Sequence, residues 1–195
     1  FASPFDESLI VSIDGSGDFS TTMFAYGKGN KIKVLDSIDF PNSLGIFYTS
    51  LTQWLGFLNY GDEYKVMGLA PYGKPIYTDK IKNLIIFEDD GKFKLNTKYF
   101  IKNLIGAVHY EGNIPIAPRL YNNNLINLIG PNRLNNKDSL TQYHKDIASS
   151  VQKVCEEVIF HILNGFNNNY NLKNIYISGG IAQNSVANGK IIENT

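Results

Sequence analysis

The stretch Ser8-Leu9-Ile10-Val11-Ser12-Ile13-Asp14-Gly15-Ser16-Gly17-Asp18 decides how the N-terminal part of the chain folds. A short apolar run that ends in Asp and Gly is typical of a buried strand entering a tight polar turn. Two more strand-like segments follow at 21–26 and 31–40, and Gly27-Lys28-Gly29-Asn30 forms the turn between them. We therefore predict three consecutive strands connected as hairpins.

Helical patterns follow these strands. Pro41-Asn42-Ser43 is a helix start signal, after which apolar residues recur at spacings of three and four as far as Leu58. The clearest helix is predicted over 139–166, with Asp138 or Ser139 as its cap. Behind it we predict a strand over 172–178, a tight turn at Gly179-Gly180 and a helix over 184–192.

The middle of the chain has weaker patterns. Segment 61–73 contains Pro71 and several glycines, so it predicts a short helix at most. Segments 81–87 and 92–95 fit either a small hairpin or a passage from helix to strand. We interpret 109–137 as mostly loop, with one short apolar segment at 125–129.

Composition excludes several classes of protein. The chain has 195 residues, 43% hydrophobic and 18% charged, which suits one globular domain rather than a disordered or fibrous chain. Its 18 Lys and Arg balance 18 Asp and Glu, which argues against a surface that holds nucleic acid or an anionic membrane by charge. No apolar run approaches the roughly 18 residues of a membrane helix, and the N-terminus lacks a basic signal-peptide start.

One cysteine, Cys155, excludes an intramolecular disulfide and a cysteine-based zinc cluster. We expect a reducing compartment and a soluble, cytoplasmic protein. The first residue is not Met and the last residues stop inside a helical pattern, so we expect this sequence to be a piece of a longer protein.

Two glycine turns are candidates for binding phosphate. Gly15, Ser16 and Gly17 follow the first strand, and Gly179 and Gly180 follow the last one. Glycine lets backbone N–H groups approach an anion, and a helix behind the second turn would add its positive N-terminal end. Short glycine motifs have low specificity, so two ordinary turns are the alternative interpretation.

Acidic and basic side chains give weaker signals. Asp14 ends a strand, and its carboxylate could hold a divalent cation beside bound phosphates, or it could only bind the backbone of its own turn. Glu63 and Lys65 are two residues apart and could be a solvated pair. The three histidines (His109, His144 and His161) lack metal-ligand spacing, and Cys155 is interpreted as a packing residue.

Five blocks of sequence carry a resemblance to a known family. They are Val11-Ser12-Ile13-Asp14-Gly15-Ser16-Gly17-Asp18, then 43–48, then Asp62-Glu63-Tyr64-Lys65-Val66-Met67-Gly68-Leu69-Ala70-Pro71-Tyr72-Gly73, then 144–152, then 179–190. In this order they resemble the O-carbamoyltransferase family of nodulation-factor and antibiotic-tailoring enzymes. The blocks span nearly the whole chain, and the third and fifth are the most specific.

That resemblance implies an α/β fold of the actin-like, sugar-kinase-like ATPase (ribonuclease H-like) type, with a mixed sheet and flanking helices, of which this chain is an incomplete domain. On this view 1–60 supplies hairpins and a helix, 61–137 the family block and a loop-rich insertion, and 138–195 the long helix, a strand and the Gly-Gly nucleotide turn. The family makes carbamoyl-adenylate from ATP and carbamoyl phosphate in a separate C-terminal domain. It then transfers the carbamoyl group to a hydroxyl of a small-molecule acceptor.

The resemblance also implies roles for particular residues. Asp14 matches a ligand of a divalent metal, usually iron, and Gly179, Gly180 and Asn184 match the nucleotide-binding turn. Gly15, Ser16 and Gly17 match the first turn, and Glu63, Lys65 and Gly68 match the family block at the cleft.

Several family features are absent from the sequence. The family's paired metal-binding histidines, its second metal-binding aspartate and its C-terminal domain are not present, so we expect weak metal binding and no turnover from this piece alone. No residue is identified as the general base. The acceptor and the oligomeric state are not specified either.

Two other functions fit the same fold. One is a small-molecule kinase or a threonylcarbamoyl-adenosine-type enzyme, and the neutral charge disfavours a tRNA partner for the latter. The other is a nucleotide-binding actin-like module that transfers no group.

Overall fold

The computed structural model describes residues 3–101, 109–135, 138–170 and 172–195. The chain divides into two compact units. The first unit comprises Phe1–Gly45, Phe87–Lys94 and Glu156–Thr195, and the second comprises Ile46–Ile86 and Leu95–Cys155. The N-terminal pair Phe1-Ala2 and the end of the loop-rich segment expected over 109–137 lie outside the described residues.

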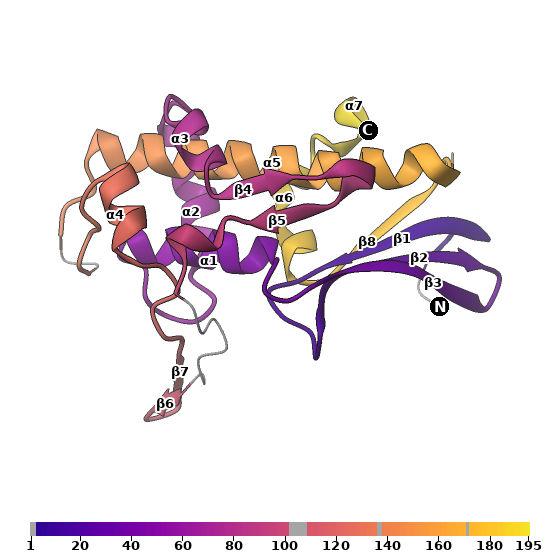
Figure 1. The fold of residues 1–195 in the computed structure, drawn as a ribbon, viewed down its shortest axis with the longest axis horizontal. Helices are drawn as coiled ribbons and strands as arrows, with labels where there is room; N and C mark the ends of the chain where they lie inside the picture. The colour runs from indigo at the N-terminus through magenta and orange to yellow at the C-terminus, as the bar shows by residue number, and fades with distance from the viewer. Residues whose placement is uncertain (1–2, 102–108, 136–137, 171) are drawn as a thin grey trace. The chain divides into compact units, whose positions relative to one another are not determined.

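The first unit is built on a four-stranded mixed sheet with the strand order β3-β2-β1-β8, which is visible in Figure 1. Strand β1 (Glu7–Ile13) pairs antiparallel with β2 (Ser20–Lys28), and β2 pairs antiparallel with β3 (Lys31–Asp39). On its other side β1 pairs in parallel with β8 (Ile175–Ser178). The three predicted hairpin-connected strands are confirmed, and so are an α/β fold and a mixed sheet.

The turn between β2 and β3 is tighter than the four residues predicted. Strand β2 continues to Lys28 and β3 begins at Lys31, so only Gly29 and Asn30 connect them. Gly29 has a φ of +54°, the left-handed conformation that two-residue hairpin turns require. The glycine at this position therefore sets the hairpin register.

One face of the sheet forms a core. Leu9, Val11 and Ile13 alternate along β1 and are fully buried, as expected for a strand with one face turned to the interior. Phe24 of β2 stacks on Phe166 of the long helix α5 (Gln142–Tyr170) with ring centroids 4.1 Å apart. Apolar burial of this kind contributes about 1.5–3 kcal/mol for each large side chain, so the alternating pattern of the first quoted stretch is sufficient to fix which face is inside.

The segment after β8 differs from the prediction. The strand is shorter than 172–178, and the helix predicted over 184–192 is interrupted. In its place the chain forms the 3-10 turn η4 (Gly180–Gln183), then α6 (Ser185–Asn188) and α7 (Ile191–Asn194). Gly189 stands at the interruption, where a helix is weakest, and the Lys190 ammonium binds both carboxylate oxygens of buried Glu156 at 2.8 and 2.9 Å.

Helix α1 (Leu44–Trp54) ends before the apolar pattern does. Gly56 has a φ of +80°, its N–H donates to the Gln53 carbonyl at 2.9 Å, and the Phe57 N–H donates to the Thr52 carbonyl at 3.2 Å. These two bonds form a Schellman motif, which stops a helix at a left-handed glycine. Leu58 therefore lies beyond the helix that its spacing predicted.

Helix α5 (Gln142–Tyr170) is the long helix predicted over 139–166, moved toward the C-terminus at both ends. The proposed caps are wrong. The Asp138 carboxylate instead accepts a hydrogen bond from the Leu134 N–H at 3.1 Å within the preceding loop. At the helix start the Thr141 N–H donates to Nδ1 of His144 at 3.1 Å, so an imidazole satisfies the first amide.

The middle of the chain contains more regular structure than predicted. Helices α2 (Glu63–Leu69), η1 (Ala70–Tyr72) and α3 (Thr78–Lys82) lead to β4 (Ile85–Phe87), η2 (Asp89–Gly91), β5 (Phe93–Leu95) and η3 (Thr97–Tyr99). Strands β4 and β5 pair with each other, so of the two predictions for this segment the hairpin is confirmed and the passage from helix to strand is not. The segment interpreted as mostly loop contains β6 (His109–Glu111) paired with β7 (Ile114–Ile116), and helix α4 (Asn123–Ile129).

Within the part of the chain that the structure describes, every helix is too short or too polar to cross a membrane.

Candidate functional site

The two glycine turns leave the sheet at the same edge. Strands β1 and β8 are parallel neighbours, with Ser12 paired to Ser178, so the residues that follow each strand emerge side by side. A Cβ atom at Gly180 would lie 3.0 Å from Oδ1 of Asp14. Two turns that are about 165 positions apart in the sequence therefore lie at one corner of the first unit.

Asp14 is exposed at this corner and makes a turn-type contact. Its Oδ1 accepts a hydrogen bond from the Gly15 N–H at 2.7 Å. The contact favours the interpretation that Asp14 binds the backbone of its own turn rather than a cation. The bonded amide is that of the next residue, Gly15, and not that of Ser16. The Asp14 carboxylate thus occupies the place that a phosphate oxygen would take at the Gly15 amide.

Two residues without a predicted role hold the first turn in place. The Ser43 hydroxyl lies 2.7 Å from the Gly15 carbonyl oxygen and 3.2 Å from that of Asp14. A Cβ atom at Gly45 would come within 2.4 Å of the Gly15 Cα. Both residues belong to the 43–48 block, and a glycine inside a helical pattern is a signal that could have drawn attention to close packing.

Packing explains some of the predicted phosphate-turn glycines. A Cβ at Gly17 would lie 2.5 Å from the Ser20 carbonyl oxygen, and one at Gly179, whose φ is +89°, would lie 2.2 Å from that of Ile13. The turn backbone requires glycine at these two positions without any ligand. A Cβ at Gly15 would meet nothing within 4 Å, and Ser16 is exposed, so this side of the corner is open.

Asn184 has a structural contact that its predicted nucleotide role did not anticipate. Its side-chain oxygen accepts the Ala187 N–H at 3.0 Å and so caps α6, and the residue is almost fully buried. The predicted continuous helix behind the Gly179-Gly180 turn is replaced by η4 and the four-residue α6. A helix of four residues has only a small dipole, so the positive helix end predicted for this turn is weak.

Glu63 and Lys65 lie on α2 in the second unit, and each contacts a neighbour there. Glu63 accepts a hydrogen bond from the Thr49 hydroxyl at 2.6 Å. The Lys65 ammonium lies 2.6 Å from the Asp62 carboxylate, whose side chain is only 7% exposed. The pKa of Lys65 is raised, chiefly by the hydrogen bond to Asp62 and to a lesser extent by the charge of that carboxylate. The two side chains thus have separate partners and are not a mutual pair.

Gly68 is exposed on α2, and a Cβ there would meet nothing within 4 Å. Glycine inside a helix costs about 0.5–1 kcal/mol relative to alanine, and contacts within the second unit give no reason for it. Gly73 is the opposite case, because a Cβ there would lie 2.0 Å from the Lys145 carbonyl oxygen. The family block thus contains one glycine required by packing and one that is not.

The 144–152 block contributes supporting contacts to the second unit. Asp146 Oδ1 accepts hydrogen bonds from the Lys74 N–H at 2.8 Å and from the Gln142 amide at 2.9 Å, and the first of these chiefly lowers the pKa of Asp146. Burial, followed by the charge of Arg133, lowers the pKa of His144. These groups anchor the 70–77 segment and the start of α5.

The resemblance implies a metal ion, which several donor side chains would have to hold. Among the residues that the structure describes, no three His, Cys, Asp or Glu side chains gather in a way that could hold a metal ion. Hard cations need several oxygen donors, and Asp14 supplies one carboxylate that is engaged with its own turn. The described residues therefore do not fit a complete metal centre.

Comparisons with known proteins place these blocks in context. The family described as "Carbamoyltransferase N-terminus" matches residues 1–195. The uncharacterized protein sll1178 of Synechocystis is 38% identical over 98% of this chain and 29% of its own length. Nodulation protein NolO of Bradyrhizobium diazoefficiens is 34% identical over 97% of this chain and 30% of its own, and nodulation protein NolNO of Sinorhizobium fredii is 32% identical over 97% and 25%.

This chain spans less than a third of the length of these curated relatives. The family match, in contrast, extends from the first residue to the last. It includes both glycine turns and the block of α2, and the five sequence blocks that carried the resemblance fall inside it. The chain therefore belongs to the carbamoyltransferase N-terminus family.

Proposed function

We propose that the full-length protein transfers a carbamoyl group from carbamoyl-adenylate, made from ATP and carbamoyl phosphate, to a hydroxyl of a sugar or natural-product acceptor. The observation that carries the proposal is the family match over the whole chain, together with two turns that lie side by side at the end of parallel strands. Ligands of α/β sheets bind outside the carboxyl ends of such strands, so this corner is a suitable place for an activated nucleotide.

The proposed reaction is an acyl transfer. The acceptor oxygen forms a bond to the carbamoyl carbon, the bond from that carbon to the adenylate phosphate oxygen breaks, AMP leaves, and the hydroxyl proton is released. Negative charge grows on the leaving phosphate, so donors fixed near it lower the barrier. We propose that the phosphate contacts the backbone of the first turn at Gly15 and Ser16 and of the Gly179-Gly180 turn beside it. The Gly15 N–H would then exchange its bond to the Asp14 carboxylate for one to the phosphate.

We assign supporting roles to the second unit and to Asp14. Lys65 is a cation that Asp62 holds in place, and the open face at Gly68 leaves room for a ligand, so we propose both, with Glu63, as ligand contacts of the second unit. Asn184 is proposed to support the nucleotide turn by capping α6. Asp14 is proposed as a ligand of a metal ion, expected to be iron, whose other ligands would come from elsewhere in the protein.

The test is a mass-spectrometric assay of the full-length protein with ATP, carbamoyl phosphate and a panel of hydroxylated acceptors. We expect an acceptor that gains one carbamoyl group, with AMP as the nucleotide product. ADP with a phosphorylated acceptor would identify a kinase instead. Absence of both adenylate and carbamoylated product across the panel would refute the proposal.

Asp14 is tested separately with a matched pair of variants. Asp14→Ala is expected to lose bound iron and to reduce transfer at least about 100-fold, in the range seen when one charge-stabilising group is removed. Asp18→Ala removes an exposed carboxylate from the same loop and is expected to keep both. If Asp14→Ala keeps both properties, Asp14 has no role in metal binding.

A further inference from the structure

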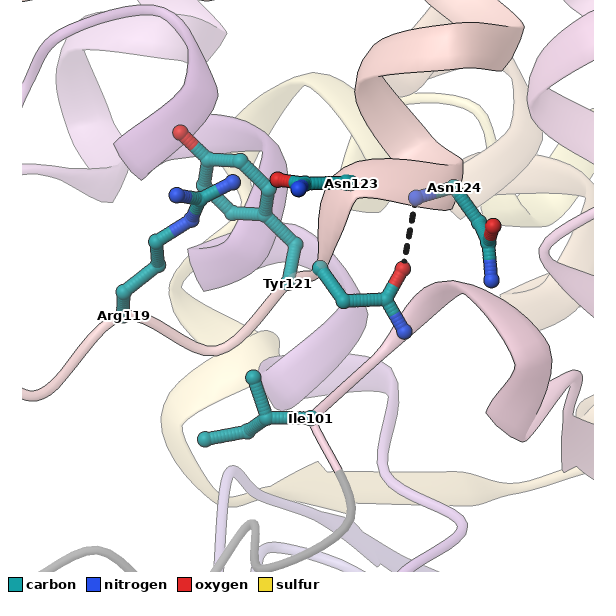
Figure 2. A pocket seen from close by; sticks show the side chains of 6 residues that line it. Ile101, Arg119, Tyr121, Asn123 and Asn124 are labelled. Atoms are coloured by element: carbon teal, nitrogen blue, oxygen red, sulfur yellow. Dashed lines mark hydrogen bonds between the residues drawn. The ribbon is translucent and has the colours of Figure 1, made fainter.

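A pocket of about 440 Å³ lies in the second unit, and none of the candidate site residues lines it. Its lining residues are Ile101, Arg119, Tyr121, Asn122, Asn123 and Asn124, and Figure 2 shows how they lie. Its size is within the 300–1,000 Å³ typical of small-molecule sites. Among the lining residues that the structure describes there are one cation, three carboxamides and no carboxylate, which disfavours a cationic ligand.

One wall of this pocket is fixed by hydrogen bonds. The Asn122 amide donates to the Phe100 carbonyl at 2.7 Å and to the Lys98 carbonyl at 2.9 Å, and its oxygen accepts the Asn124 N–H at 2.8 Å, the dashed line in Figure 2. Asn124 donates to the same Lys98 carbonyl at 2.8 Å. Asn122 thus has few hydrogen bonds left to offer a ligand, but it gives the pocket a preformed shape.

Arg119 is the charged group of the pocket, and its guanidinium is held in place by an aromatic ring. The guanidinium carbon lies 4.2 Å from the centroid of the Tyr121 ring, and Tyr121 is only 3% exposed. Burial raises the pKa of Tyr121, so the phenol stays neutral and does not compensate the cation. Arg119 itself is exposed, and no carboxylate in the described part of the chain forms an ion pair with it.

A guanidinium that is oriented by stacking and has no carboxylate partner is suited to bidentate contact with an oxyanion. We propose that this pocket binds a small hydroxylated molecule that carries a phosphate or carboxylate group, with Arg119 on the oxyanion and the carboxamide of Asn123 near the hydroxyls. The proposal does not depend on carbamoyl transfer. It concerns a separate group of residues, none of which was a candidate in the sequence analysis.

The experiment is isothermal titration calorimetry of the full-length protein with three probes: glucose, glucose 6-phosphate and glucuronate. We expect glucose 6-phosphate or glucuronate to bind at least ten times more tightly than glucose, and the stronger of the two identifies phosphate or carboxylate as the preferred group. Arg119→Gln is expected to lower the affinity for the more tightly bound probe at least tenfold. Arg119 is exposed, and a melting curve checks that the variant is folded.

Lys80→Gln is the matched control. Lys80 is an exposed cation of the same unit that also lies over a tyrosine, 5.8 Å from the Tyr77 ring centroid, but it does not line the pocket. The Lys80→Gln variant is expected to bind the charged probe as tightly as the unchanged protein does. The proposal is refuted if glucose binds as well as both charged probes, if Arg119→Gln binds unchanged, or if Lys80→Gln loses as much affinity as Arg119→Gln.

Discussion

Glycines in two regions of this molecule differ in whether the packing around them requires glycine. At the corner of the first unit, a side chain at Gly45 or Gly179 would collide with backbone 2.4 or 2.2 Å away. On α2 of the second unit, a side chain at Gly68 would meet nothing. Both regions belong to blocks that resemble the family, so resemblance alone does not separate the two cases.

This difference teaches how to interpret a glycine in a candidate site. Where neighbouring backbone fills the place of the Cβ, glycine is needed for the fold and says nothing about a ligand. Where the place is open and glycine weakens the helix, folding does not explain it, and close approach of another group is the remaining physical reason. Gly15 and Gly68 are therefore better candidates for ligand contact than Gly17 and Gly179.

The largest expected effect is that of Gly179→Ala. The substitution combines a left-handed φ of +89° with a 2.2 Å contact to the Ile13 carbonyl oxygen, so we expect a loss of about 3 kcal/mol or more in the free energy of unfolding. Urea unfolding of the full-length protein measures it. Gly15→Ala, in the same corner but with open space, is the control and is expected to cost far less. Equal losses would remove the distinction between filled and open positions.

Ser43→Ala should have the next largest effect. The variant removes the hydroxyl that lies 2.7 Å from the Gly15 carbonyl, and Ser43 is fully buried, so we expect a loss of about 1–2 kcal/mol. Urea unfolding again provides the measurement. Ser16→Ala is a suitable control because Ser16 is exposed in the turn that Ser43 supports. If both variants unfold alike, Ser43 does not hold the turn.

Gly68→Ala should change stability in the opposite direction. Alanine is the better helix former and has room here, so we expect a gain of about 0.5–1 kcal/mol in the free energy of unfolding. If Gly68 contacts a ligand as proposed, the same variant loses transfer activity, most visibly as a higher KM. A more stable variant with unchanged kinetics would show that the open face of α2 is not used.

The smallest expected effect concerns pH. The folded-state pKa of His144 lies below its ordinary 6.5, chiefly through burial, so the folded protein favours the neutral imidazole. As pH falls below 6.5, the unfolded chain takes up the proton first, and stability present above that pH is lost until pH reaches the folded pKa. Asp146, whose pKa is lowered from 3.8, contributes only in a more acidic window.

The corresponding variant is His144→Asn. The unfolding free energy between pH 7.5 and about 5, measured for both proteins, is expected to depend less on pH in the variant. An unchanged slope would assign this pH dependence to other groups. Together with the urea unfolding of the glycine variants, this measurement compares an anchoring contact of the second unit with the backbone packing at the corner of the first unit.

Local sequence patterns predicted the elements better than their ends. Alternation in β1 and the apolar stripe of α5 identified the first strand and the longest helix, because each pattern repeats over several residues. Their ends depend on single contacts, such as the Gly56 backbone bonds that stop α1 and the His144 imidazole at the start of α5. No periodicity signals such contacts.

The candidate site was predicted in part. Asp14, Gly15 and the Gly179-Gly180 turn were found from glycines that follow apolar strands, and their family came from the blocks around them. Ser43 and Gly45 were missed, because their importance comes from a turn nearly 30 positions earlier in the chain. The Arg119 pocket was missed as well, because its lining residues come from two separate segments that the hydrogen bonds of Asn122 join.

The sequence by itself determined the four strands of the mixed sheet, the long helix and the family, since these follow from periodic burial and from contiguous motifs. Only the tertiary structure decided that β1 and β8 are neighbours, that two turns at opposite ends of the chain meet, and which glycines are required by packing. The physical reason is the sequence separation over which each kind of interaction acts. Patterning and turn preference act between residues a few positions apart, whereas strand pairing and the space around a Cβ depend on segments that the chain separates by more than 160 residues.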